Sequence, residues 1–187
     1  SIDFDMFSKL PNFKKFIRHA ACCRQVRSVY PSLTYPAHTS IVTGRTPAHH
    51  GIVNNILLQP ERSSPDWYWQ RNYIRGTTLY DEVLKQGKHV AALLWPVTAK
   101  SEITWNLPEI FANRRWTNQI LTSAANGTVG YQLMLNHRFG RLRDGIRQPA
   151  LDNFVHASLK YTLKTYRPDL TLVHFTDLDT QRHHYGV

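Results

Sequence analysis

Cysteine is nearly absent from this sequence of 187 residues, which has only Cys22 and Cys23, adjacent in the chain. Two neighbouring cysteines cannot build a disulfide framework, and their number excludes a zinc ribbon with four thiolate ligands. Free thiols fit a reducing compartment, so the cysteines lean toward a cytoplasmic protein.

Long apolar runs are also lacking. No segment approaches the roughly 20 consecutive apolar residues that span a bilayer. The first ten residues, SIDFDMFSKL, carry aspartates where a signal peptide has a basic and then an apolar region. We therefore expect no membrane span. The hydrophobic fraction of 42%, with 5 Trp, 9 Tyr and 8 Phe, instead predicts a folded protein with a sizeable core.

Acidic residues are few. The sequence has 13 Asp and Glu against 23 Lys and Arg, which gives a formal net charge of +10 at pH 7. This charge favours anionic partners such as nucleotides, nucleic acid or acidic lipid head groups. The basic residues are nevertheless scattered, as at Arg114-Arg115, and form no dense tract. The scattered charge therefore leaves two alternatives, a solvated cationic surface with no anionic partner and a module that binds nucleic acid.

The order of predicted elements indicates an α/β fold. Apolar residues at helical spacing predict helices at 8–19, 35–43, 77–86 and 151–166. Runs of apolar residues predict strands at 22–31, 89–97 and 170–175. Residues 59–76 are rich in turn formers, and residues 104–150 carry several loop signals, among them Asn126-Gly127, so both segments are interpreted as less regular. Helices that alternate with buried strands predict a mostly parallel sheet flanked by helices, in a single domain over residues 1–187.

The stretch SLTYPAHTSIVTGR, residues 32–45, places Thr34 directly before the predicted helix 35–43. Pro36 presets the helical backbone angle, so the first amide groups of this helix should point outward beside Thr34. A helix N-terminus of this kind binds phosphate and favours an ionised oxygen. Thr34 is therefore either an ordinary helix cap or a nucleophile that a metal or a base must activate.

The stretch FTDLDTQRHHYG, residues 175–186, follows the predicted strand 170–175 directly. Its polar side chains therefore lie at the carboxyl end of a parallel strand, where open α/β sheets place their ligands. Asp179 and His183 are four residues apart, so a helix would present both from one face as a chelating pair for a divalent metal. Asp177 and His184 are candidates for supporting this pair. The alternative is a capping aspartate with a surface histidine.

Taken together, the two stretches resemble a known family. YPSLTYPAHTSIVTGRTPAHHGIVNN, followed by DLDTQRHHYG, is similar to the type I phosphodiesterase/nucleotide pyrophosphatase family of the alkaline phosphatase superfamily. The resemblance runs through nearly the whole chain and implies an alkaline-phosphatase-like core. It identifies Thr34 with the family's threonine nucleophile. The family pattern Asp-x-x-x-His-x-Tyr-Gly falls on Asp179, His183, Tyr185 and Gly186.

The resemblance also implies a mechanism. Members of the family hydrolyse phosphodiesters and nucleotide pyrophosphates with two zinc ions and form a covalent phospho-threonine ester. On this pattern Asp179 and His183 are ligands of one ion, and the Thr34 oxygen is a ligand of the other. Physically, two ions can clamp the attacking and leaving oxygens of an in-line displacement.

Three departures from the family pattern bear on the site. The family's first-strand aspartate is assigned to Asp3, with Asp5 as the alternative, although the strand before it is absent. Ala37 stands where many diesterases of the family have an asparagine that binds the phosphoryl oxygen. Asn54 or Asn55 is a candidate to replace that donor, and a structural role in a turn is the alternative. Because Ala37 cannot donate this hydrogen bond, the sequence does not decide whether a diester or a monoester is the preferred substrate.

The third departure concerns the extent of the chain. The family's later Asp-His pair and final histidine have no match in this sequence, so we expect an N-terminal half of a longer hydrolase domain, incomplete at both ends, with the remaining ligands beyond Val187. Trp67 is a candidate for stacking on the substrate, and Tyr185 is a candidate substrate contact from the second motif. His38 is expected to be a hydrogen-bonded packing residue.

Overall fold

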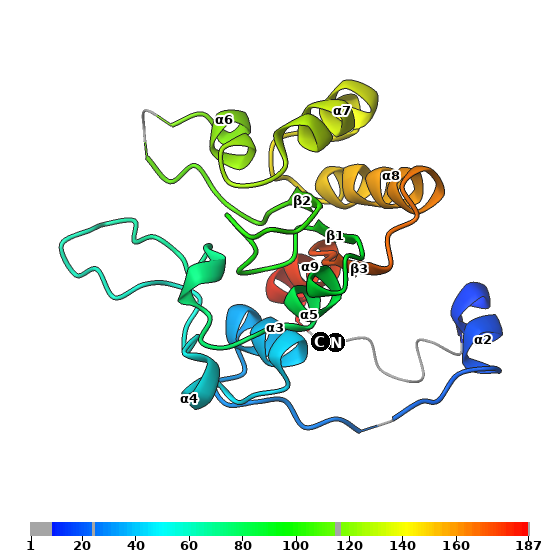
Figure 1. Ribbon diagram of the computed structural model, residues 1–187, viewed down its shortest axis with the longest axis horizontal. Helices are drawn as coiled ribbons and strands as arrows, with labels where there is room; N and C mark the ends of the chain where they lie inside the picture. The colour runs from blue at the N-terminus through cyan, green and yellow to red at the C-terminus, as the bar shows by residue number, and fades with distance from the viewer. Residues whose placement is uncertain (1–8, 24, 115–116, 187) are drawn as a thin grey trace. The chain divides into compact units, whose positions relative to one another are not determined.

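The computed structural model describes residues 9–23, 25–114 and 117–186 (Figure 1). These residues form two compact units. The larger unit is Val29–Asp177, and the smaller unit combines the described residues up to Ser28 with those from Leu178 onward. Each unit is described by itself.

A three-stranded parallel sheet is the centre of the larger unit. Its strands are β1 (Val90–Leu93), β2 (Trp105–Leu107) and β3 (Leu170–Val173), in the spatial order β2-β1-β3. Ala91 pairs with Trp105 on one side and with Thr171 on the other. The predicted strands at 89–97 and 170–175 are thus confirmed, although both are shorter than predicted. All three carboxyl ends lie at the same edge of the sheet.

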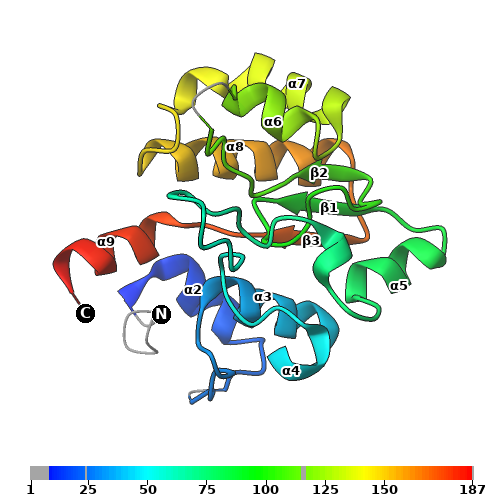
Figure 2. The same cartoon turned by 90° about the vertical axis from the view of Figure 1, so that its left-hand side faces the viewer.

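Helices cover both faces of this sheet, as Figure 2 shows. The helices of the larger unit are α3 (Thr34–Thr43), α4 (Pro47–His50), α5 (Leu79–Lys85), α6 (Gln119–Ala124), α7 (Val129–Phe139) and α8 (Ala150–Thr165). Two short 3₁₀ segments, η1 (Arg71–Tyr73) and η2 (Gly140–Leu142), complete them. The predicted helices 35–43, 77–86 and 151–166 are confirmed as α3, α5 and α8.

The alternation of β1 side chains explains why its sequence is continuously apolar. Val90 and Ala92 pack with residues of α3 and α5, whereas Ala91 and Leu93 pack with residues of α7 and α8. All four residues are fully buried. Successive side chains of a strand point to opposite faces, so a strand covered on both faces needs apolar residues at every position.

The prediction of a strand at 22–31 is wrong. The described residues of this segment form neither strand nor helix, and most of them are exposed. Val26 and Tyr30, for example, are 80% and 93% exposed. A strand is stable only when its backbone groups pair with a neighbour, and apolar spacing alone does not supply that neighbour.

The segment 104–150 is more regular than its loop signals predict, because it contains β2, α6 and α7. The sequence reading missed α6 because its start depends on a cap: the Asn118 side chain accepts hydrogen bonds from the amides of Ile120 and Leu121. The turn that Asn126-Gly127 predicts is confirmed, and it is the short connection between α6 and α7.

The smaller unit contains α2 (Pro11–Ile17) and most of α9 (Asp177–Tyr185). Helix α2 corresponds to the central part of the helix predicted at 8–19. Helix α9 carries the second motif, and no separate helix was assigned to it from periodicity. Among the helices of the described residues, none is both long and apolar enough to cross a bilayer.

Candidate active site

Thr34 is the first residue of α3, and the residue before the helix is Leu33 in an extended conformation. The interpretation of Thr34 as the helix cap is therefore wrong, because the cap position belongs to Leu33, whose side chain makes no capping hydrogen bond. The prediction that the helix begins beside Thr34 is confirmed. Thr34 is half-buried, and the ten-residue helix ends at Gly44 in the left-handed conformation.

Asn55 supplies the cap that the local sequence lacks. Its Oδ1 accepts a hydrogen bond of 2.9 Å from the backbone N–H of Tyr35, the second residue of α3. The backbone carbonyl of Asn55 in turn accepts from the N–H of Tyr68 at 3.0 Å, and the neighbouring residues Ile56 and Trp67 form an antiparallel bridge. Because an amide side chain has both an acceptor and an NH₂ donor, Asn55 keeps its donor group beside the start of the helix.

Asn54 has a different role. Its Oδ1 accepts from the backbone N–H of Asn55 at 2.7 Å, a contact typical of a turn, and the residue is exposed. The structure therefore brings Asn55 to the start of α3, whereas the Asn54 side chain stabilises the turn that precedes Asn55.

His50 anchors the segment that delivers Asn55. It is fully buried, its Nε2 lies 2.9 Å from Ser40 Oγ in α3, and its Nδ1 accepts from the N–H of Ile52 at 3.2 Å. Since Nδ1 accepts, the neutral ring carries its proton on Nε2, beside Ser40 Oγ. Burial lowers the pKa of His50, against a backbone hydrogen bond with Pro36 that raises it, so the neutral form is favoured.

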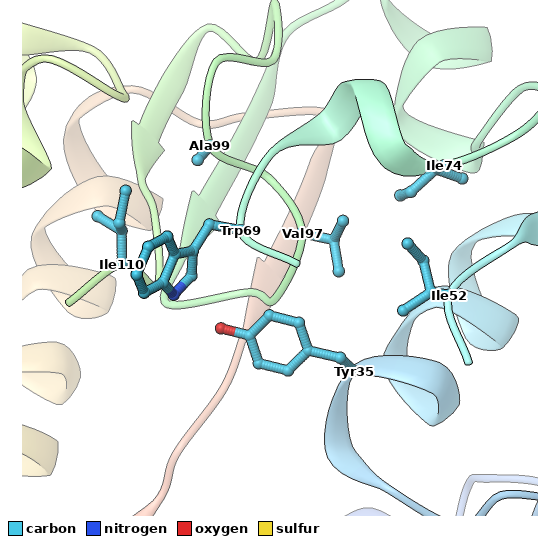
Figure 3. Packing of buried hydrophobic residues seen from close by; sticks show 7 residues of the cluster. All are labelled: Tyr35, Ile52, Trp69, Ile74, Val97, Ala99 and Ile110. Atoms are coloured by element: carbon cyan, nitrogen blue, oxygen red, sulfur yellow. The ribbon is translucent and has the colours of Figure 1, made fainter. Parts of the chain in front are cut away.

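Trp67 packs in the same region. Its ring meets the buried ring of Tyr35 edge-on at 5.3 Å between centroids, and it meets Phe111 in the same manner at 5.6 Å. Both Trp67 and Phe111 pack against a buried apolar cluster that contains Tyr35 and Trp69. Figure 3 shows this cluster, in which the Tyr35 hydroxyl points toward Trp69. Trp67 is half-buried, so part of its surface remains open to solvent or to a ligand.

Asp179 and His183 lie on one face of α9, as their spacing predicts. Asp179 Oδ2 and His183 Nε2 are 3.5 Å apart, and the two side chains are 69% and 80% exposed. Carboxylate oxygen and imidazole nitrogen are common zinc ligands, and donors of a tetrahedral zinc site are separated by a similar distance. The pair therefore fits a metal ion as two of its ligands.

The rest of a metal site is not formed by the described residues. Within ranges 9–23, 25–114 and 117–186, no three His, Cys, Asp or Glu side chains gather into a group that could hold a metal ion. Asp3 and its alternative Asp5 lie outside the described residues. Tyr185, the expected substrate contact at the end of α9, is 85% exposed.

Asp152 of α8 fixes the start of α9, a role that no local pattern of the sequence predicts. Its Oδ1 accepts from the backbone N–H of Thr176 at 3.0 Å, and its Oδ2 accepts from that of Asp177 at 2.9 Å. A carboxylate at the first amides of a helix stabilises it through hydrogen bonds and the helix dipole. Asp177, expected to support the metal pair, is therefore seen here as the first residue of the helix that carries it.

With this geometry in place, comparison with known proteins decides the family. Residues 2–187 match the family model of type I phosphodiesterase/nucleotide pyrophosphatase. The chain belongs to this family. The resemblance read from Thr34, Asp179 and His183 is thereby confirmed at the level of the family.

Two curated members of this type I phosphodiesterase family illustrate the relationship. The chain is 30% identical to human ectonucleotide pyrophosphatase/phosphodiesterase family member 1 over 113 residues, which are 54% of this chain and 12% of that protein. It is 27% identical to bovine ectonucleotide pyrophosphatase/phosphodiesterase family member 3 over 188 residues, 95% of this chain and 17% of that protein. The chain thus spans a small part of the length of these relatives.

A solved structure supports the fold. The phosphonoacetate hydrolase of Sinorhizobium meliloti 1021, solved in complex with phosphonoacetate, superposes with a TM-score of 0.57 at 24% sequence identity. The match covers 90% of this chain and 41% of that one. The expected alkaline-phosphatase-like arrangement, a parallel sheet between layers of helices, is confirmed.

Proposed function

We propose that this type I phosphodiesterase chain carries the nucleophile of a hydrolase for phosphodiesters or nucleotide pyrophosphates, and that the nucleophile is Thr34. The observation that supports this most directly is the start of α3. A half-buried threonine is its first residue, and an asparagine from a distant loop lies against its second amide. A helix N-terminus with an added amide donor is suited to a phosphoryl group.

The residues of this chain define the chemical steps. The Thr34 hydroxyl attacks phosphorus and its proton passes to solvent water, while the bond from phosphorus to the leaving oxygen breaks and that oxygen departs with the electron pair. The product is a phospho-threonine ester. A water molecule then attacks the same phosphorus, and the Thr34 oxygen leaves and recovers a proton. Two in-line displacements retain the configuration at phosphorus.

The donors at the start of α3 hold the phosphoryl group through both steps. The Asn55 NH₂ group is proposed to donate to a non-bridging oxygen, while its Oδ1 stays on the amide of Tyr35. Trp67 is proposed to contact the organic group of the ester through its open face, and Asn54 and Tyr185 remain proposed substrate contacts.

Divalent metal ions, most simply two zinc ions, are proposed as cofactors, with Asp3, Thr34, Asp179 and His183 among their ligands. The Asp179–His183 pair is the part of this set whose geometry fits, at 3.5 Å between donor atoms. When bound, zinc supplies positive charge that stabilises developing oxyanions and lowers the pKa of a coordinated hydroxyl.

Metal removal tests this proposal. We expect the natural gene product that contains these residues to hydrolyse a nitrophenyl nucleotide diester, to lose this turnover on dialysis against a chelator, and to regain it with added zinc. Replacing both Asp179 and His183 with alanine should prevent the recovery. Turnover that survives chelation would contradict the metal-dependent mechanism.

The donor role of Asn55 gives a separate prediction. Asn55→Asp keeps an Oδ1 acceptor for the Tyr35 amide but replaces the NH₂ donor with an oxygen, so the helix cap remains and the phosphoryl contact is lost. We expect kcat/KM for the diester to fall by about 10²–10³-fold. The matched variant Asn118→Asp adds the same charge at an exposed cap whose side chain only accepts hydrogen bonds, and it should lower kcat/KM by less than about tenfold. Equal losses in the two variants would assign the effect to charge alone.

Ala37 favours a second candidate function within the same superfamily, a phosphomonoesterase or phosphoryl transferase. Alanine at this half-buried position of α3 cannot donate the hydrogen bond that an asparagine gives. Comparing kcat/KM for a nitrophenyl diester and the corresponding monoester distinguishes the candidates. A preference for the monoester would favour the second.

A further inference from the structure

A buried acid, Glu109, and a half-buried base, His174, lie at the carboxyl edge of the sheet, and neither is used in the proposed mechanism. Glu109 follows β2 by two residues and is 8% exposed, and His174 follows β3 directly. Glu109 Oε2 and His174 Nδ1 are 3.4 Å apart. A buried carboxylate is costly to desolvate, and apolar residues of similar size often stabilise a core equally well. The stability of the core therefore does not require Glu109 and His174, and their position at the carboxyl edge of the sheet points to a role at the candidate active site.

The pair reaches the nucleophile helix through His38. The His38 ring packs on the His174 ring at 4.5 Å between centroids, with a tilt of 56°. On another side, His38 meets the Trp95 ring edge-on at 4.8 Å. His38 Nδ1 lies 2.8 Å from the backbone carbonyl oxygen of Thr34. Since a carbonyl only accepts, Nδ1 is the donor in this bond. The expectation that His38 is a hydrogen-bonded packing residue is confirmed.

The loop that carries Trp95 is held in an unusual backbone conformation. Leu94, Val97 and Lys100 have φ angles of 52°, 58° and 56°. This left-handed region is unfavourable for non-glycine residues, above all for a β-branched valine, and such conformations concentrate at functional sites. Thr98 Oγ1 donates to the Trp95 carbonyl at 2.7 Å and helps to hold the loop. The His38 ring therefore packs against a Trp95 ring whose loop is held in place.

Glu109 also acts on the residue next to the nucleophile. The pKa of Tyr35 is raised well above its ordinary value, first by burial and then by the negative charge of Glu109, while the nearby Trp69 side chain opposes the rise. Glu109 is therefore electrostatically close to the first turn of α3. His174 contacts His38, and Glu109 acts on Tyr35, so both members of the pair face the first turn of α3.

We propose that Glu109 and His174 are positioning residues that hold the His38 ring against Trp95, so that its Nδ1–H stays on the Thr34 carbonyl and fixes the backbone of the nucleophile. The inference rests on the proposed function of Thr34 for its catalytic meaning. The claim that Glu109 stiffens the first turn of α3 does not depend on catalysis and is tested separately.

Residue-resolved amide hydrogen exchange on the 187-residue chain provides the test. In Glu109→Gln, which keeps the shape of the side chain, we expect exchange of the Tyr35 and Ala37 amides to accelerate about tenfold. Exchange at Ala91 and Ala92 in β1 should stay unchanged. Glu102→Gln is the matched control, because it removes the same charge at an exposed position and should change neither region. Equal acceleration in α3 and β1 would indicate a general loss of stability and would overturn the proposal, as would unchanged exchange in α3.

A double-mutant cycle tests the path through His38. His38→Phe keeps a ring but removes the bond to the Thr34 carbonyl, so Glu109→Gln should have little further effect on Tyr35 exchange in this background. An additive tenfold effect would overturn the path. If Glu109→Gln does not fold, His174→Gln takes its place in both experiments with the same expected results. In the active gene product, Glu109→Gln should lower kcat with KM unchanged. If hydrogen exchange changes as expected but kcat does not, the result would count against the role of Thr34.

Discussion

Thr34→Ala should reduce diester turnover by roughly 10⁴-fold or more, because it removes the oxygen that forms the covalent ester. The fold should be unaffected. Thr34 is half-buried at the first position of α3, and alanine is a better helix former than threonine. Turnover of a nitrophenyl diester and the thermal unfolding midpoint, measured on the same preparation, check the two halves of this prediction.

Thr34→Ser is the matched control, since it keeps the hydroxyl and should retain part of the activity. Acid quenching during turnover of a nitrophenyl nucleotide diester, followed by peptide mass spectrometry, should detect the nucleotide that remains after nitrophenol leaves, bound to residues 32–45 of the unmodified protein, and none in Thr34→Ala. Retained turnover in the alanine variant would remove Thr34 as the nucleophile even though the chain belongs to the family.

Gly127→Ala should destabilise the larger unit by about 3 kcal/mol or more, the range of severe steric substitutions. A Cβ atom at this position would lie 2.5 Å from the backbone oxygen of Asn106, and 2.6 Å from both Gln132 Nε2 and Pro108 Cδ. Real Cβ atoms do not approach a backbone oxygen so closely, so the connection between α6 and α7 would have to move away from β2. For a chain of this size the unfolding midpoint should fall by roughly 6–12 °C.

Gly130→Ala provides the control for this substitution. Gly130 lies in α7, and a Cβ there would meet no atom within 4 Å. Alanine in a helix interior is favoured over glycine by about 0.5–1 kcal/mol, so this variant should be slightly more stable. Urea unfolding of the two variants checks the contrast. Destabilisation by both would show that the loss does not arise from the contact with Asn106.

The sequence predicted those parts of the site that depend on neighbours along the chain. Asp179 and His183 share a face because a helix places residues four apart together. Thr34 lies at a helix start because Pro36 favours the first turn of a helix. Strong apolar runs also predicted β1 and β3, whose side chains are covered on both sides of the sheet.

The parts that the sequence did not predict depend on contacts between distant segments. Asn55 caps α3 across 20 residues, and Asp152 caps the start of α9 from the preceding helix. Neither residue differs in composition or spacing from an ordinary turn or helix residue. Glu109 and His174 likewise meet only because β2 and β3 flank β1. Local patterns carry no information on such pairs, whereas the strand order does.

The strand order β2-β1-β3 has a consequence for synthesis of the chain. Val90 pairs with Leu170, so one edge of β1 has no partner until 80 further residues have been made. Until then the unpaired N–H and C=O groups along that edge of the apolar strand Val90–Leu93 can pair with another chain, which is the usual origin of aggregation from sheet edges. Because parallel pairing over long separations forms slowly, we expect expression at lower temperature, or with chaperones that bind extended apolar segments, to raise the soluble yield.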